Sequence, residues 1–275
     1  MIHLSMLWPG GREKALTLSY DDAVTQDIRL LEIMNRNKIK GTFNLNSGFL
    51  GKPGRLIREG HPVEHNKIAP EKIAEVYQGH EVAVHTVTHP NLVDLPDAQV
   101  LYEVLADRQN LEALVGYPVR GMAYPSGRVD ERVVELMKDT GIVFARGVDT
   151  TKKFAVPKKE TWLNWHCSCH HWELEPMIDP FLNGKGLMLL AVWGHAYEFD
   201  QRDDWEVIEN QLDRLGNHED IWYATNIEVF DYITAYNSLD VAVDGSSAYN
   251  RSCMNVWVSV RGKKYEIPAG QVVRF

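Results

Sequence analysis

Short runs of apolar, often β-branched residues alternate along most of the chain with stretches in which apolar residues recur at helical spacing. The runs predict eight strands, at 15–20, 41–46, 81–85, 119–124, 142–148, 162–168, 187–194 and 221–227. Helical spacing predicts helices over 97–115, 130–140, 204–215 and 228–236. Alternating strands and helices are typical of α/β folds with a parallel sheet.

The positions of polar residues distinguish between two such folds, an open doubly wound sheet and a closed barrel. Polar clusters follow several of the predicted strands directly, namely Asp21-Asp22, His85 with His89, Pro125-Ser126-Gly127, and His195. The carboxyl ends of all strands in a barrel meet at one mouth. We therefore expect a distorted (β/α)7–8 barrel, with these clusters gathered at its rim.

From about Leu239 the pattern changes. Val256, Val258 and Val260 alternate with larger or polar residues, and Gly262 precedes a second short run at 265–267. This pattern is typical of a β-hairpin. We expect a barrel over residues 1–238 and a small β-rich appendage over 239–275.

Bulk composition excludes several classes of protein. The 275 residues are 44% hydrophobic, enough for a sizeable core, and the net charge of −9 argues against nucleic acid or an anionic membrane as a partner. No run of 18 apolar residues exists, so we expect no membrane span. Three cysteines argue against a disulfide framework. The first residues lack the pattern of a secretory signal, so we expect a cytoplasmic protein, or a secreted one if a leader was removed. The oligomeric state stays open.

Two adjacent acids and two nearby histidines indicate a metal site. Asp21 and Asp22 directly follow an apolar run, where their charges repel each other unless a cation lies beside them. His85 and His89 follow another apolar run and are four residues apart, so both rings can reach one ion. One carboxylate and two imidazoles that leave positions open for water are typical of hydrolytic metal sites.

These motifs, taken in order, resemble the polysaccharide deacetylase family, also called the NodB-homology or carbohydrate esterase family 4 group. The motifs are Ser19-Tyr20-Asp21-Asp22, His85-Thr86-Val87-Thr88-His89 and Trp193-Gly194-His195, supported by Gly41-Thr42-Phe43-Asn44. The resemblance covers about residues 12–236. It implies hydrolysis of an acetyl group from an acetylated carbohydrate, with an N-acetyl target slightly favoured over an O-acetyl target.

The resemblance also implies a role for each residue. Asp22, His85 and His89 would hold a divalent metal, with zinc favoured over cobalt, nickel or manganese. Asp21 would be the general base that accepts a proton from water. His195 would be the general acid that protonates the leaving group, and histidine titrates near neutral pH.

The third family motif is only partly present. The family usually places an arginine shortly before a Pro-aromatic-Gly sequence, whereas Pro125-Ser126-Gly127 has Arg120 five residues before the proline. Either Arg120 or Arg146, at the end of the next predicted strand, would pair with the base. The backbone N–H of Ser126 would donate to the oxyanion.

The fourth family motif is not recognisable, and residues 162–171 stand in its place. This stretch is rich in tryptophan, histidine and cysteine. We expect five residues to bind substrate: Tyr124, Trp165, His170, His171 and Trp193. Two alternatives stay open for the stretch: a separate zinc site using Cys167, Cys169 and a histidine, and a strand that packs alternate residues.

Several other polar residues have structural rather than functional interpretations, and other functions make predictions that can be compared with the sequence. We expect the acidic run from Glu198 to Asp204 to be a solvated loop, and His61, His65 and His80 to be loop residues. A metal-independent cyclic amide hydrolase would lack a metal ligand, and a non-catalytic sugar-binding barrel would lack the base or the acid. The predicted metal ligands Asp22, His85 and His89, the base Asp21 and the acid His195 are all present. An interaction module in the β-rich tail, carried by the barrel, is a weaker alternative.

Overall fold

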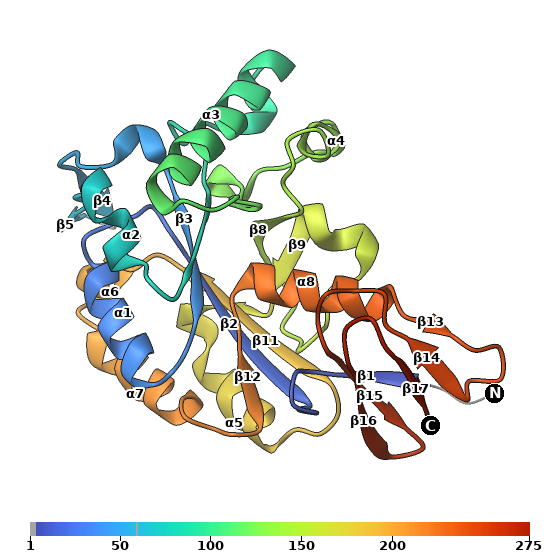
Figure 1. Ribbon diagram of the computed structural model, residues 1–275. Helices are drawn as coiled ribbons and strands as arrows, with labels where there is room; N and C mark the ends of the chain where they lie inside the picture. Colours follow the sequence, from blue (N-terminus) through green and yellow to red (C-terminus); the bar gives the residue numbers. More distant parts are fainter. Residues whose placement is uncertain (1–3, 59) are drawn as a thin grey trace.

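The computed structural model describes residues 4–58 and 60–275. Within them, a nine-stranded sheet of parallel pairs forms the centre of the fold (Figure 1). Its strands are β2 (Lys14–Asp21), β3 (Gly41–Leu45), β6 (Glu81–Val84), β7 (Gly121–Ala123), β8 (Phe144–Thr150), β9 (Trp165–Cys167), β10 (Cys169–His170), β11 (Met188–Gly194) and β12 (Ile221–Tyr223). The order is β10-β11-β2-β3-β6-β7-β8-β9, and β12 lies beside the first residues of β2.

One short segment closes this sheet into a barrel. β9 pairs with β8, β10 pairs with β11, and only Ser168 separates β9 from β10. The N–H of Ser168 donates to Ala191 O at 2.7 Å, and the N–H of Lys152 donates to Ser168 O at 3.0 Å. Residues 165–170 therefore join the two ends of the sheet. The predicted distorted barrel is confirmed.

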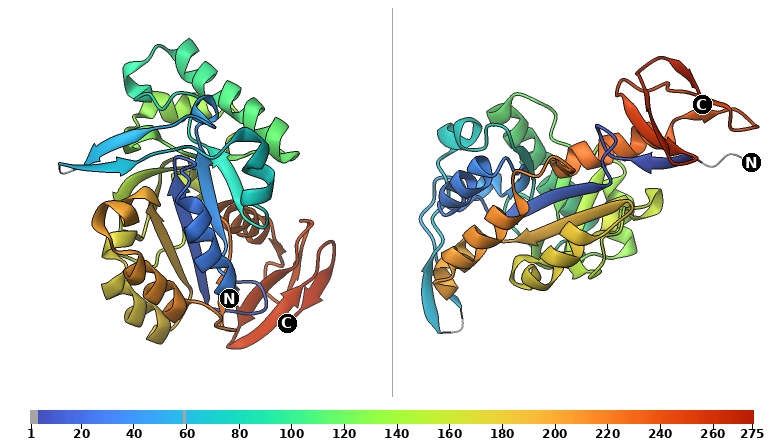
Figure 2. Two further views of the ribbon diagram at one scale, coloured as in Figure 1. Left: turned by 90° about the vertical axis from the view of Figure 1, so that its left-hand side faces the viewer. Right: turned by 90° about the horizontal axis from the view of Figure 1, so that it is seen from below.

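Helices cover the outside of the barrel (Figures 1 and 2). They are α1 (Asp27–Arg36), α2 (Ile73–Val76), α3 (Asp97–Val115), α4 (Glu131–Met137), α5 (Glu175–Asn183), α6 (Tyr197–Arg202), α7 (Trp205–Leu215) and α8 (Asn226–Asn237). Asp130 caps α4 by accepting the N–H of Val133 at 2.8 Å, which satisfies a donor that the helix start leaves free. None of the described helices is long and apolar enough to cross a bilayer.

Side chains alternate along β2 between two environments. All eight residues of β2 are buried. Leu16, Leu18 and Tyr20 belong to the core cluster shared with the surrounding helices. The side chains between them point the other way. Thr17 donates to Asn226 Oδ1 of α8 at 2.8 Å, and Asp21 contacts Arg146 of β8. The last residue of β2 therefore directs its carboxylate into the barrel mouth.

Two β-rich additions lie at opposite ends of the molecule (right view of Figure 2). The hairpin of β4 (Arg55–Arg58) and β5 (His61–Glu64) extends from one end. The other end carries β13 (Asp240–Val241), β14 (Ser247–Tyr249), β15 (Val256–Val260), β16 (Lys263–Ile267) and β17 (Val272–Arg274). β15 and β16 form the hairpin predicted at 256–267, and β1 (Leu4–Leu7) pairs with β15. Residues 4–7, expected in the barrel, thus join the appendage sheet. The boundary at 238/239 stays a prediction.

Candidate active site at the barrel mouth

The predicted site residues meet where the strands end. Asp21 closes β2, His85 directly follows β6, and His195 directly follows β11. They line a cavity of about 800 Å³. The remaining lining residues include Asp22, His89, Tyr124, Ser126, Val148 and Tyr197, together with Phe49, Lys52, Pro53, Leu56, His65 and Lys67 from the segment around the β4–β5 hairpin.

Left-handed backbone conformations cluster at this mouth. Asp22 has φ +85°, Thr86 +69°, His89 +56° and Ser126 +56°. Such values are uncommon in residues other than glycine and persist only where the surroundings hold them. The N–H of Asp22 donates to Asn44 O at 2.9 Å, and the N–H of His89 donates to Thr86 Oγ1 at 3.0 Å. Of these residues, Asp22, His89 and Ser126 line the cavity, whereas Thr86 is buried and supports the His89 backbone.

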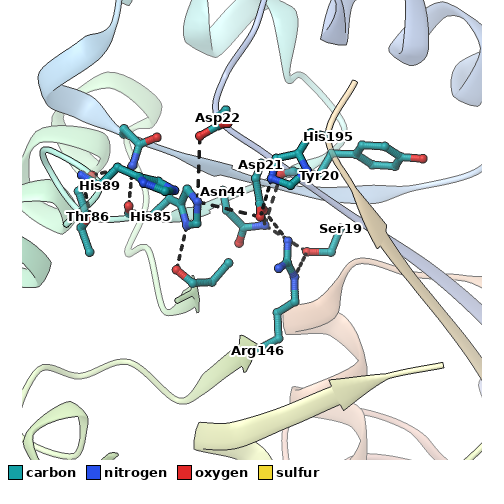
Figure 3. Close-up of polar contacts among 12 residues, drawn as sticks. Ser19, Tyr20, Asp21, Asp22, Asn44, His85, Thr86, His89, Arg146 and His195 are labelled. Atoms are coloured by element: carbon teal, nitrogen blue, oxygen red, sulfur yellow. Dashed lines mark hydrogen bonds and ion pairs between the residues drawn. The ribbon is translucent and has the colours of Figure 1, made fainter. Parts of the chain in front are cut away.

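Asp22, His85 and His89 fit a divalent metal. Their ligand atoms all lie within 4.8 Å of one another. His85 Nδ1 lies 2.8 Å from Ala123 O, which can only accept, so Nδ1 carries the hydrogen and Nε2 is left with a lone pair. Burial lowers the pKa of His85 to about 4, so the ring is neutral. Nε2 is buried without a hydrogen-bond partner in the described residues, and it faces the Asp22 carboxylate at 4.0 Å (Figure 3).

Acidic residues of α3 fix the loop that carries these two histidines. Asp107 accepts the N–H of His85 at 3.0 Å. Glu103 accepts from Thr88 twice, from its N–H at 2.8 Å and from its hydroxyl at 2.7 Å. The rings of His85 and His89 then meet edge to face, with centroids 4.7 Å apart. Ligand histidines held through their backbones cost less entropy on binding an ion.

Asp21 has different partners from Asp22. Its Oδ1 forms an ion pair with Arg146 Nη2 and accepts from Asn44 Nδ2 at 2.9 Å (Figure 3). Its Oδ2 lies 3.8 Å from His85 Nε2 and 3.8 Å from His195 Nε2. Arg146 is fully buried, and its Nε donates to Ser19 Oγ at 3.1 Å. Asp21 is therefore held by an arginine and lies between His85 and His195, whereas Asp22 lies within reach of both His85 and His89.

Arg120 does not belong to this site, contrary to one of the two predictions. It precedes β7, at the amino end of the barrel, and pairs with Asp231 of α8 through contacts of 2.6 and 3.0 Å. Arg146 lies within β8, whose register places it beside Ala123 at the end of β7. Tyr124 and Ser126 do line the cavity, as expected, with the Tyr124 hydroxyl donating to Leu163 O at 2.7 Å.

Glu198 was expected in a solvated loop, but it is buried in α6 beside His195. Its Oε2 accepts the N–H of His195 at 3.1 Å and lies 3.4 Å from His195 Nδ1. Burial lowers the pKa of His195, but Glu198, Asp21 and Asp22 together more than offset this effect, so the net pKa is raised. The carboxylate also turns Nε2 of this ring toward Asp21. The acidic sequence between Glu198 and Asp204 does not indicate that Glu198 is buried.

His170 and His171 contact the same carboxylate rather than the cavity. Their Nε2 atoms lie 3.1 and 3.4 Å from Glu198 Oε2. The three residues are close enough to hold a second ion. However, His170 Nδ1 accepts the N–H of Trp172 at 3.3 Å, so its proton sits on Nε2 and points at Glu198. We therefore interpret the cluster as a support for Glu198, in which His170 donates to the carboxylate and His171 packs against it. Neither His170 nor His171 lines the cavity, where both are predicted to bind substrate.

The tryptophans and cysteines of the same stretch are core residues. Trp165 is buried against Trp162 and Phe144, so its expected place in the substrate pocket is wrong. Trp193 is also buried and lies under Arg146, 5.2 Å from the guanidinium. Cys167 and Cys169 are both buried, and neither belongs to a group of three possible metal ligands within the described residues. The strand-packing alternative describes this segment best.

Two residues of the segment after β5 were missed at the sequence level. His65 Nε2 lies 3.1 Å from Asp22 Oδ2, and Lys67 Nζ lies 3.7 Å from Asp22 Oδ1. Burial alone would raise the pKa of Asp22, but His65 and Lys67 hold it well below its usual value. Nothing in the local sequence connects residues 65–67 with residue 22. Their contact depends on how the β4–β5 hairpin folds back over the mouth.

Comparison with known sequences extends these observations. A family model for polysaccharide deacetylase matches residues 9–145, which contain the first two motifs. The chain is similar to peptidoglycan-N-acetylglucosamine deacetylase PgdA of Listeria monocytogenes, with 26% identity over 125 residues. That match covers 44% of this chain and 23% of the Listeria protein. The chain therefore spans less than a quarter of the length of these curated relatives.

Solved structures share the fold at low sequence identity. A protein from Mycobacterium smegmatis, described as a candidate polysaccharide deacetylase, aligns with a TM-score of 0.60 and 15% identity over 86% of this chain and 96% of its own. The Xyl-CE4 domain of a xylanase from the hindgut metagenome of Trinervitermes trinervoides aligns with a TM-score of 0.51 and 15% identity over 81% of this chain and 92% of its own. Taken with the family match and the ordered motifs, these findings show that the chain belongs to the polysaccharide deacetylase family.

Proposed function

We propose that this protein hydrolyses an acetyl group from a carbohydrate with the help of a bound divalent metal. The observation that carries the proposal is the buried lone pair of His85 Nε2, which faces the Asp22 carboxylate beside His89. A buried acceptor without a donor is costly. A cation bound by the three residues would satisfy it, and zinc accepts this set of one oxygen and two nitrogen ligands.

The residues of the chain divide the remaining chemistry among them. When bound, the metal would polarise the acetyl carbonyl and lower the pKa of water. Asp21, which pairs with Arg146, would accept a proton from the attacking water. His195, with Nδ1 turned toward Glu198, would present Nε2 to the leaving nitrogen or oxygen. Ser126 lies on the cavity wall, where its backbone could donate to the developing oxyanion.

An N-acetylated sugar is the favoured substrate class. The similar Listeria protein is named as a peptidoglycan-N-acetylglucosamine deacetylase. The cavity of about 800 Å³ combines the polar site with apolar walls from Phe49, Leu56 and Tyr197. Such walls can pack against the flat apolar faces of pyranose rings.

The experiment is acetate release from a panel of N- and O-acetylated oligosaccharides, with the metal content of the protein measured in parallel. Asp22→Ala and strong chelation should both abolish activity, and zinc or cobalt should restore the chelated wild type. Asp21→Asn should retain the metal but lose most turnover. Asp231→Asn, which changes a carboxylate far from the cavity, is the matched control. Activity that survives exhaustive chelation would exclude the metal role.

A further inference from the structure

Lys67 occupies an unusual position beside the proposed metal ligand. Only 8% of the residue is exposed, and its Nζ donates to the backbone oxygen of Asp22 at 2.6 Å. The same ammonium lies 3.7 Å from Asp22 Oδ1 and 3.4 Å from His65 Nε2. It therefore contacts the one acidic residue in the proposed ligand set.

The backbone around Lys67 holds the ammonium in place. The N–H of Lys67 donates to Lys52 O at 3.0 Å, and the N–H of Ile68 donates to Ala23 O at 2.9 Å. The N–H of Thr25 donates to Asn66 O at 2.9 Å. Residues 66–68 thus run alongside residues 23–25, directly after Asp22. This pairing fixes the Lys67 backbone beside Asp22, and the hydrogen bond from Nζ to the Asp22 backbone oxygen holds the ammonium near the carboxylate.

The site is consequently charge-balanced without an ion. Arg146 pairs with Asp21, and Lys67 pairs with Asp22. Buried carboxylates without such partners are strongly destabilising. An entering divalent cation would face a positive charge already placed beside its carboxylate ligand. The lysine would therefore favour the metal-free protein and oppose the metal-bound one.

We propose that Lys67 sets the metal affinity of this site, by competing with the cation for Asp22 while keeping the metal-free protein folded. The inference rests on the metal site of the proposed function. A unit charge next to a doubly charged ion in a partly buried site should change the binding constant by about tenfold to a hundredfold. The two effects of the lysine have opposite signs, which separates this role from a merely structural one.

The test compares four proteins by two measurements, the zinc dissociation constant from chelator competition and the melting temperature of the metal-free form. Lys67→Met removes the charge but keeps an apolar side chain of similar length, and Lys67→Arg keeps the charge. Lys52→Met is the matched control, since Lys52 lines the same cavity but its Nζ donates to Gly48 O. If Lys67→Met purifies only with metal, Lys67→Gln takes its place.

Lys67→Met should bind zinc at least about tenfold more tightly than the wild type and melt at a lower temperature without metal. Lys67→Arg and Lys52→Met should stay close to the wild type in affinity. Zinc binding that is unchanged or weaker in Lys67→Met would overturn this inference and leave the metal site standing. Failure of both the wild type and Lys67→Met to bind zinc would overturn the metal site itself, and the inference with it.

Discussion

Replacing Arg146 with methionine should destabilise the protein far more than the same change at Arg120. Each arginine pairs with an aspartate, but the two pairs lie in different surroundings. Arg146 is fully buried and Asp21 is 3% exposed, whereas the side chains of Arg120 and Asp231 are 36% and 34% exposed. The comparison therefore isolates the effect of burial on an otherwise similar ion pair.

The expected magnitudes follow from what each substitution leaves behind. Arg146→Met leaves the Asp21 carboxylate buried without its cation, and it removes the bond from Nε to Ser19. Breaking a buried pair in this way costs about 3–5 kcal/mol. That is a large share of the roughly 5–15 kcal/mol that stabilises a typical domain. Arg120→Met leaves a half-exposed carboxylate that water can solvate, at a cost of about 0–1 kcal/mol.

Equilibrium denaturant unfolding of the metal-free protein measures both values. A third variant, Arg146→Met combined with Asp21→Asn, removes the stranded charge while keeping the shape of the side chain. It should recover at least half of the stability lost in Arg146→Met. An equal loss at the two arginines, or no recovery in the double variant, would refute the interpretation of Asp21 and Arg146 as a buried charge pair.

Three further predictions concern the surroundings of the site. Glu198→Gln should lower the pKa of His195. A general acid loses its proton as the pH rises, so the decline of activity in a pH–rate profile should begin at a lower pH in this variant. An unchanged profile would exclude Glu198 as the residue that raises the pKa of His195. Burial raises the pKa of Asp27 to about 8, so stability should fall as the pH rises from about 4 to about 8. Asp27→Asn should reduce the pH slope of the unfolding free energy by about 1.4 kcal/mol per pH unit between pH 5 and 7, leaving the part due to Glu81 and Asp107, whose pKa values burial raises to about 7; a slope equal to that of the wild type would contradict the raised pKa of Asp27. Trp165→Ala should lower the unfolding free energy by about 3–5 kcal/mol, because Trp165 is a core residue. A variant of normal stability with a raised KM would instead indicate that Trp165 binds substrate.

Short contiguous motifs were the part of the site that the sequence could predict. Asp22, His85 and His89 each follow an apolar strand run closely, so strand ends alone bring them to the mouth. The choice between Arg120 and Arg146 depends on position along a strand, which sequence spacing does not give. Arg120 precedes its strand and Arg146 lies within the next one, paired beside the last residue of β7.

Burial of charge was the part that the sequence could not predict. Glu198 belongs to an acidic run that is typical of a solvated surface, and it becomes buried only because three histidine side chains pack around it. Lys67 approaches Asp22 only because the segment after β5 folds back alongside residues 23–25. In the tryptophan-rich stretch, a core strand and a pocket wall have the same composition, so only the closure of the barrel decides between them.

The pairing of β1 with β15 has a practical consequence for handling the protein. Residues at both ends of the described chain lie in the appendage, and the eight-residue strand β2 carries the backbone about 26 Å from there to the mouth. A surface, bead or fused reporter joined to either end would therefore lie on the side of the barrel away from the cavity. Immobilised protein should keep the cavity open to solutes in the surrounding buffer.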